Sequence, residues 1–96
     1  MLEPIFEWDD GKNAANLRKH GVSFEAAQEA FLDPFRVIAQ DVSHGGAEKR
    51  LYCIGRAGGG ILTVRYTMRG GHIRIIGAGY WRKGRRAYGQ ANQIHG

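Results

Sequence analysis

Apolar and polar residues alternate along residues 61–68 and again along residues 72–79, with Gly70 and Gly71 between the two stretches. A period of two residues is typical of a β-strand, because successive side chains point to opposite faces of the sheet. A pair of glycines between two such strands favours a tight hairpin turn. The alternation predicts a core face made of Leu62, Val64, Tyr66, Met68, Ile73, Ile75 and Gly77. The opposite face is then polar and carries Thr63, Arg65, Thr67, His72 and Arg74.

Shorter extended patterns precede this hairpin, at residues 4–8, 35–41 and 50–56. In the first of them, Ile5 or Phe6 and Trp8 would face the core. Polar residues at 43–48 separate the other two, and the glycines at 58–60 lead into the hairpin. No lysine followed by a hydroxyl residue comes after these glycines, so a hairpin turn is favoured over a phosphate-binding loop. Residues 35–79 are therefore predicted to form an antiparallel meander.

A first helix is predicted over residues 11–20. Asp9 or Asp10 can cap its N-terminus, because a carboxylate there accepts hydrogen bonds from the unpaired first-turn N–H groups. Gly21 is the expected left-handed stop. Its inner side would be formed by Ala14 and Leu17, with Ala15 and the stem of Arg18 beside them.

Two further helices are predicted, one before and one after the meander in the sequence. Ser23 would cap the earlier one, which ends at Asp33 and Pro34 because proline disfavours the helical conformation in the residue before it. Its apolar residues recur at helical spacing and are Phe24, Ala27, Ala30 and Phe31. The later helix spans residues 82–93 and would turn inward Ala87, Tyr88, Ala91 and Ile94.

The order of elements, β-α-α-β-β-β-β-α, predicts one α+β domain over residues 1–96, with two N-terminal helices packed on the antiparallel meander and a basic C-terminal helix. A chain of 96 residues buries roughly 65% of its unfolded surface, enough for a single core. The one cysteine, Cys53, is expected to be a buried small apolar residue. No apolar run approaches the ~20 residues of a membrane span and no signal segment begins the chain, so a cytoplasmic location without membrane contact is expected.

Acidic and basic residues are distributed unevenly between the two halves of the chain. Residues 1–48 hold all nine acidic residues and four basic ones, a net charge of −5. Residues 49–96 hold ten Lys and Arg and no acidic residue, a net charge of +10, and the halves sum to the +5 of the whole chain. Such a half projects a positive field that attracts polyanions. Nucleic acid is the commonest partner of this kind, and an acidic protein is the alternative.

The residue types missing from the sequence, above all from its basic half, exclude several kinds of catalytic site. Two-metal nucleases need clustered carboxylates, and residues 49–96 contain none. The four histidines show no zinc-ligand spacing, and no serine- or cysteine-nucleophile motif is present. No metal and no cofactor are therefore expected. Cleavage of RNA remains open to such a chain, because RNA supplies its own nucleophile, the 2′-hydroxyl group.

A metal-free ribonuclease needs side chains that hold the phosphate and side chains that move protons. Arginine can hold two phosphate oxygens with its planar fork, and histidine, lysine or tyrosine can carry protons. We predict a catalytic group made of Arg65, Arg74, Arg82, His20 and Lys19. The predicted RNA-binding residues are Arg69, His72, Lys83, Arg85, Arg86 and Tyr88. The alternative is a solvated sheet face whose charges serve solubility, which the hairpin pattern alone slightly favours.

Short motifs along nearly the whole chain carry a family resemblance. They are Phe6-Glu7-Trp8-Asp9, Lys12, Asn16, Lys19-His20-Gly21-Val22, Phe24-Glu25, Asp33-Pro34, Arg50, Tyr66-Thr67, residues 73–76 and the basic residues 82–88. In these motifs the chain closely resembles the BrnT family of bacterial toxins. The resemblance implies a small ribonuclease with a RelE/ParE-like fold that inhibits translation by cutting RNA. It also implies a BrnA-like ribbon-helix-helix antitoxin that neutralises the toxin, with operator DNA bound only through that antitoxin.

One segment departs from the pattern of that family. Family members commonly end the last strand with Ser-Ala-Arg, whose arginine is a favoured active-site residue, whereas this chain has Gly77-Ala78-Gly79. The departure leaves Arg65, Arg74 and Arg82 as the expected phosphate ligands. It also keeps open a catalytically weak homologue that acts as antitoxin partner and operon co-repressor. An unrelated small nucleic-acid-binding domain is the third alternative.

Overall fold

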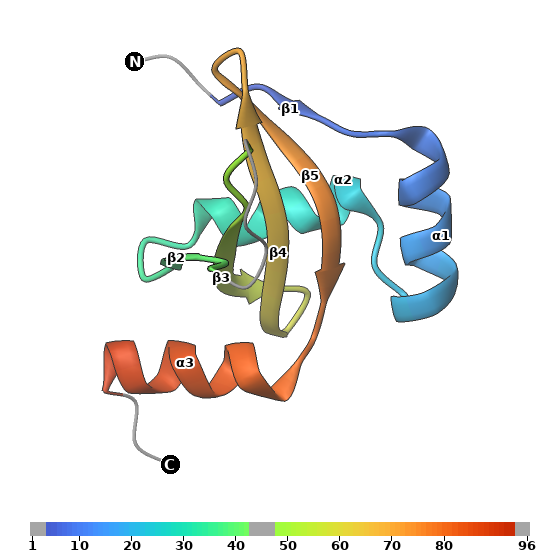
Figure 1. Ribbon diagram of the computed structural model, residues 1–96. Helices are drawn as coiled ribbons and strands as arrows, with labels where there is room; N and C mark the ends of the chain where they lie inside the picture. Colours follow the sequence, from blue (N-terminus) through green and yellow to red (C-terminus); the bar gives the residue numbers. More distant parts are fainter. Residues whose placement is uncertain (1–3, 43–47, 94–96) are drawn as a thin grey trace.

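The computed structural model describes residues 4–42 and 48–93 and contains one five-stranded sheet with helices around it (Figure 1). The strands are β1 (Phe6–Glu7), β2 (Val37–Gln40), β3 (Leu51–Ala57), β4 (Gly60–Arg69) and β5 (His72–Gly79). The helices are α1 (Asp10–His20), α2 (Phe24–Ala27), the 3₁₀ helix η1 (Gln28–Leu32) and α3 (Arg82–Asn92). None of the helices in these described ranges is both long and apolar enough to cross a membrane.

The sheet is mixed, with strand order β1-β5-β4-β3-β2. Strands β2 to β5 pair antiparallel with their neighbours in sequence, as the meander prediction requires. Strand β1 joins the other edge parallel to β5, with Phe6 opposite Ile73. The prediction of an α+β domain is confirmed, and the prediction of a purely antiparallel sheet is wrong. A two-residue strand leaves too little pattern to indicate its partner or its direction.

Both hairpins of the meander turn on pairs of glycines. Gly58 and Gly59 have φ of 57° and 83°, and Gly70 and Gly71 have φ of 59° and 81°. Positive φ at both central residues is what a two-residue type I′ hairpin turn requires, and glycine adopts it without steric cost. Both predicted glycine turns are therefore confirmed. The predicted polar turn at 43–48 falls almost entirely outside the described residues.

An irregularity between β4 and β5 changes which residues share a face. Tyr66 lies opposite Ile75, but Arg65 lies opposite Gly77, so Ile76 is an extra residue on β5. One inserted residue reverses the alternation of side chains beyond it. Gly77 therefore shares the face of Arg65, and the prediction that it joins the core face is wrong.

One face of the sheet packs on α2 and η1 and forms the core. The residues with no exposed surface include Phe24, Ala27, Ala30, Cys53, Leu62 and Val64. Burial raises the pKa of the Cys53 thiol to about 12, so this cysteine is an apolar core residue, as predicted. Met68 was predicted on this face too, but this residue is 48% exposed.

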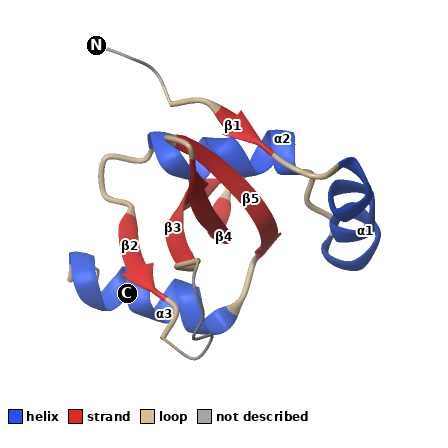
Figure 2. Cartoon of the chain, turned by 45° about the horizontal axis from the view of Figure 1, so that its top comes forward, coloured by secondary structure: helices blue, strands red, loops and turns tan. Residues whose placement is uncertain are grey.

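The opposite face is covered at one end by α3, which lies across the sheet from α2 (Figure 2). A Cβ atom added to Gly84 of α3 would overlap Thr63 Oγ1, so glycine permits this close approach. Thr63 is 6% exposed, and Thr67, whose hydroxyl donates to the Lys49 carbonyl at 2.8 Å, is 2% exposed. The prediction that both threonines lie on an open polar face is therefore wrong. Packing of α3 and of the chain before β3 closes over them.

Tyr88 and Asp33 tie α3 to the end of η1. Tyr88 is 2% exposed, and its hydroxyl donates to Asp33 Oδ2 at 2.7 Å. The inward prediction for Tyr88 is confirmed, whereas Ala91 is exposed and Ile94 lies outside the described residues. The second predicted helix does end before Asp33, as α2 continued by η1, and its Ser23 cap accepts from the Ala26 N–H at 3.1 Å.

Helix α1 stands beside the edge of β5 and does not pack on the sheet face, in contrast to the prediction for both N-terminal helices (Figure 2). Its predicted ends are confirmed, because Asp9 accepts from the Lys12 N–H at 2.9 Å and Gly21 has a φ of 70°. The predicted inner side is wrong. Leu17 is 51% exposed and Ala14 is exposed, whereas Asn16 is buried.

Candidate active site

A row of residues crosses the part of the sheet that α3 leaves uncovered. The register places Ala39 opposite Tyr52, Tyr52 opposite Arg65, and Arg65 opposite Gly77. Gly77 has no side chain, and a Cβ atom there would lie 3.5 Å from Arg65 Nε. The guanidinium of Arg65 therefore lies over β5 at the bottom of a hollow. Clefts open on both sides of this arginine.

The first cleft lies between α1 and the exposed part of the sheet and has a volume of about 350 Å³. It is lined by Lys12, Ala15, Asn16, Lys19, His20, Arg50, Arg65, Ile76, Gly77 and Trp81. Four of these residues carry a permanent positive charge, and no Asp or Glu is among them. Cations gathered around a concave surface concentrate the positive field where an anionic ligand would lie.

Helix α1 presents one continuous side to this cleft. Lys12, Ala15, Asn16 and Lys19 follow the spacing i, i+3, i+4 and i+7, which places them on the same side of a helix. Asn16 fixes the helix against β5, because its Nδ2 donates to the carbonyl oxygens of Val22 and Ala78, both at 2.9 Å, and its Oδ1 accepts from the Ala78 N–H at 3.2 Å. The amide of Asn16 thus bonds to the free edge of β5 as a neighbouring strand would.

Trp81 forms one wall of the cleft and takes the place of a missing side chain. A Cβ atom added to Gly79 would lie 2.5 Å from Cε2 and Cζ2 of the Trp81 indole, closer than real contacts allow. The same indole meets His20 edge to face, with ring centroids 5.4 Å apart. The space in which an arginine side chain would begin at position 79 is therefore filled by Trp81, which also orients His20.

Arg65 has an unused hydrogen-bond donor. Its Nε is buried and has no hydrogen-bond partner among the described residues. Tyr52, its neighbour on β3, donates its hydroxyl to Asp41 at 3.0 Å, and burial together with this bond raises the pKa of Tyr52 above 10.0. Tyr52 is therefore neutral and adds no negative charge beside Arg65. A buried donor of a charged group without a partner is costly, and the rest of the Arg65 guanidinium, which lines both clefts, is placed to bind an incoming anion.

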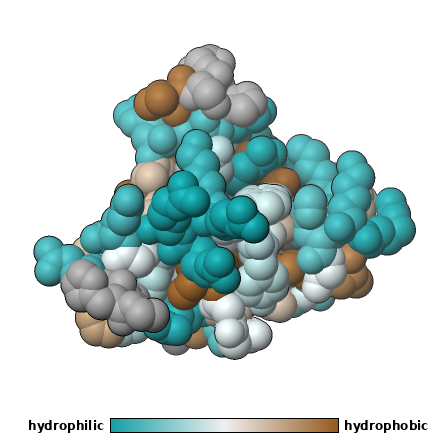
Figure 3. Space-filling view, turned by 90° about the horizontal axis from the view of Figure 1, so that it is seen from below, coloured by the Kyte–Doolittle hydropathy of each residue, from teal (hydrophilic) through white to brown (hydrophobic). Residues whose placement is uncertain are grey.

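A second cleft begins on the other side of Arg65. Its volume is about 530 Å³, its lining is mainly apolar, and it shares Arg65 and Trp81 with the first cleft. The remaining lining residues come from β2, β3, β4 and the first turns of α3. In the space-filling view from below, hydrophilic side chains gather over α3, with apolar surface between them (Figure 3).

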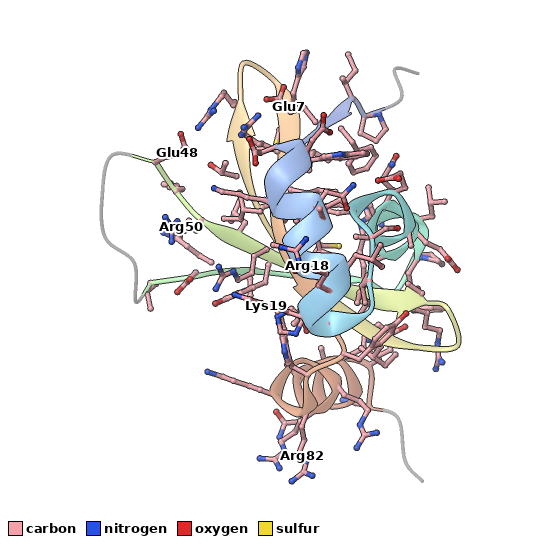
Figure 4. All side chains as sticks on the ribbon, turned by 90° about the vertical axis from the view of Figure 1, so that its right-hand side faces the viewer. Glu7, Arg18, Lys19, Glu48, Arg50 and Arg82 are labelled. Carbon is pink, nitrogen blue, oxygen red and sulfur yellow. The ribbon has the colours of Figure 1, made fainter. Side chains whose placement is uncertain are left out.

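The structure brings together only part of the predicted catalytic group. Arg65, Lys19 and His20 line the first cleft, but Arg74 and Arg82 do not. Arg74 Nη1 lies 3.0 Å from Glu7 Oε2 in an ion pair. Arg82 is exposed on the side of α3 that is turned away from Lys19 and Arg50 (Figure 4).

The predicted RNA-binding residues are also dispersed. His72 Nδ1 lies 2.8 Å from Glu7 Oε1. The hydrogen bond of Glu7 with His72, and after it the one with Arg74, holds the pKa of Glu7 below 4.5. Arg69 pairs with Glu48 at 3.1 Å. Lys83 lines the second cleft. Two arginines, Arg85 and Arg86, are exposed on α3, whereas Tyr88 is buried against Asp33 and presents no surface to RNA.

Lys12, Arg50 and Trp81 line the first cleft but were not among the predicted site residues. The first could have been found from its helical spacing to Lys19. The second could have been found from the turn at Gly58 and Gly59, whose register places Tyr52 opposite Arg65 and thus brings the start of β3 beside this arginine. For Trp81 no signal in the sequence pattern was available, because its position depends on the absent side chain of Gly79.

Within residues 4–42 and 48–93, no three or more His, Cys, Asp or Glu side chains are grouped as a metal site would require. A family model described as the ribonuclease toxin BrnT of type II toxin–antitoxin systems matches residues 8–84. No curated protein matches the chain.

Proposed function

Because the chain belongs to the BrnT family of ribonuclease toxins of type II toxin–antitoxin systems, we propose that its first cleft cleaves RNA without a metal ion. The observation that carries this proposal is the lining of the cleft. Lys12, Lys19, Arg50 and Arg65 surround it together with His20, and no carboxylate is among the lining residues. A phosphodiester is the anion that such a site would bind.

The reaction needs no nucleophile from the protein. The 2′-hydroxyl of RNA attacks the adjacent phosphorus, the bond to the 5′-oxygen breaks, and the products carry a 2′,3′-cyclic phosphate and a free 5′-hydroxyl. Arg65 would hold the phosphate oxygens as negative charge develops on them, because this arginine lines the cleft. Lys19 and His20 would move the protons to and from the two oxygens.

Type II systems pair a toxin with an antitoxin, so the chain has a protein partner of that class. We propose the finer identity from the family resemblance: a BrnA-like ribbon-helix-helix antitoxin that neutralises the toxin and carries the complex to operator DNA. The cellular effect proposed is inhibition of translation. The mixed sheet with α2 and α3 on opposite faces is the basis for proposing a RelE-like fold.

A second function is favoured by one observation, the contact between Gly79 and Trp81. Position 79 has no side chain to offer a phosphate, and the indole fills the space in which one would begin. On this ground the alternative is a catalytically weak toxin that serves as antitoxin partner and operon co-repressor. The two functions differ in whether the isolated chain cuts RNA.

The test is cleavage of single-stranded RNA by the purified chain in the presence of a chelator. We expect cyclic-phosphate ends and a rate that falls roughly 10²-fold or more in Arg65→Ala, as for the loss of a donor aimed at developing charge. Arg18→Ala is the matched control, because Arg18 is exposed on α1 and lines neither cleft. Activity that needs added magnesium would contradict metal independence. Undetectable cleavage by the folded wild-type chain would favour the co-repressor.

A further inference from the structure

The second cleft has the features of a site for a planar aromatic ligand. Its lining includes the aromatic rings of Tyr52 and Trp81 and the apolar side chain of Ile54. Two alanines, Ala39 on β2 and Ala87 on α3, leave the space between the walls open. The volume of about 530 Å³ lies within the range of roughly 300–1,000 Å³ typical of ligand pockets.

Both aromatic walls are held in place before any ligand arrives. The Tyr52 hydroxyl is bonded to Asp41 at 3.0 Å. Trp81 is fixed by the backbone of Gly79 beside it and by its edge-to-face contact with the His20 ring. A preformed aromatic surface binds with little loss of side-chain freedom, which favours stacking with a flat ring.

The position of this cleft relative to the first one indicates which flat ring it would take. Arg65 and Trp81 line both clefts, so a phosphate bound at Arg65 would lie beside the second cleft. Lys83 also lines this cleft, and no carboxylate is among its lining residues. In a nucleic acid strand, every phosphate is followed within one nucleotide by a base, a flat ring with apolar faces.

We propose that the second cleft binds the nucleobase next to the phosphate held at Arg65, and that it thereby selects the position at which RNA is cut. The proposal rests on the proposed function of the first cleft. It deepens that function by assigning base binding to Tyr52, Trp81 and the space at Ala39 and Ala87. An antitoxin segment seated in the same apolar cleft is the competing occupant.

Filling the cleft should remove base binding and leave phosphate binding intact. Ala87→Phe places a ring in the cleft from α3, and Ala39→Leu fills it from β2 on the opposite wall. Ala91→Phe is the matched control, because Ala91 is exposed on the same helix and lines neither cleft. Arg65→Ala reports on the phosphate site. Thermal unfolding of each variant establishes that it is folded before binding is measured.

The probes are two fluorescent 2′-O-methyl heptanucleotides, oligouridine and a fully abasic strand of equal length. Methylation blocks the nucleophile, so binding is measured without cleavage. We expect the wild-type chain and Ala91→Phe to bind oligouridine roughly 5- to 100-fold more tightly than the abasic strand, as for the stacking of one base. Ala87→Phe and Ala39→Leu should bind the two strands almost equally, at the wild-type affinity for the abasic strand.

The outcomes separate the two proposals. One outcome is that Arg65→Ala weakens the binding of both strands while the folded cleft-filling variants keep the wild-type preference for oligouridine. This result would overturn the proposed base site and support the phosphate site. A preference that persists while cleft filling abolishes binding of the cognate antitoxin would assign the cleft to that protein instead. If the wild-type chain binds neither strand, both proposals fail.

Discussion

Lys19 and Arg18 are neighbours in the sequence with different surroundings. Lys19 lines the first cleft, whereas Arg18 is exposed and lines neither cleft. With 3.6 residues per turn, consecutive residues of a helix point about 100° apart. The two cations therefore contribute equally to the net charge of the chain but unequally to the field within the cleft.

This difference predicts the salt dependence of RNA binding. Lys19→Ala should make the slope of log affinity against log salt concentration shallower by about 0.7, the value for one phosphate contact on a single strand. Arg18→Ala should leave the slope unchanged. The measurement is a titration of an uncleavable single-stranded oligonucleotide at several salt concentrations. Equal changes of slope in the two variants would show that only the overall charge matters.

The contact between Gly79 and Trp81 gives a second prediction about single residues. Gly79→Ala should lower the free energy of unfolding by about 1–3 kcal/mol, the usual cost of overpacking, because the new Cβ atom would lie 2.5 Å from the indole. In a Trp81→Ala background the same substitution should cost much less. Denaturant unfolding of the four proteins in this cycle measures the coupling. Additive effects would mean that the indole does not restrict position 79.

At the scale of elements, the placement of α1 depends on a polar residue. Asn16 bonds to the backbone of Val22 and Ala78, whereas Leu17 has half of its surface in solvent. Helix α1 carries Lys12, Lys19 and His20 into the cleft, so its attachment to β5 positions a large part of the candidate site. An amide can complete the edge of a strand, which an apolar side chain cannot do.

Replacing the polar residue Asn16 should therefore destabilise the fold more than replacing its apolar neighbour Leu17. Asn16→Ala leaves backbone groups of Ala78 without partners and should lower the free energy of unfolding by about 1–3 kcal/mol. Leu17→Ala should change it by less than about 0.5 kcal/mol, as for an exposed position. Chemical denaturation compares them directly. A larger loss in Leu17→Ala would place the apolar side of α1 against the sheet.

At the scale of the whole molecule, Asp33 joins the two layers that lie on opposite faces of the sheet. It follows η1, and it accepts hydrogen bonds from the Tyr88 hydroxyl of α3 at 2.7 Å and from the Arg56 N–H at 2.8 Å. Burial of Asp33 opposes ionisation, but these hydrogen bonds, with a third from the Phe35 N–H, outweigh it and hold the pKa of Asp33 below 3.8. Because protonation is harder in the folded state than in the unfolded state, the ionised Asp33 stabilises the fold.

The direction of this shift predicts an acid dependence of stability. The contribution of Asp33 is complete above its ordinary pKa of 3.8 and is lost as the pH falls through the lower folded-state value. Asp33→Asn should lower Tm by at least about 4 °C at pH 7, and its difference from the wild-type chain should shrink below pH 3.8. Thermal unfolding scans between neutral and strongly acidic pH measure this difference in Tm. Glu29→Gln, on the exposed side of η1, is the control, and a difference between wild type and Asp33→Asn that stays constant with pH would contradict the role of the charge.

Much of the fold was determined by the sequence through local interactions. The caps at Asp9, Ser23 and Gly21 form where they were predicted, because each depends on one side chain or one φ angle and on backbone groups within a few residues. The two glycine pairs set both hairpin turns for the same reason. A turn also sets the register of its hairpin, so the position of Tyr52 opposite Arg65 was already contained in the sequence.

Tertiary structure alone decided that Arg65 belongs to the candidate site and that Arg74 does not. The extra residue Ile76 places Gly77 under Arg65, and an irregular strand has no signature in the alternation of residues. The parallel pairing of β1 brings Glu7 to Arg74, and the carboxylate neutralises this arginine. The alternation of residues by itself had placed Arg74 on an open polar face. These contacts join residues far apart in the chain. Whether they form depends on how the packed elements meet, which a local pattern of residues does not encode.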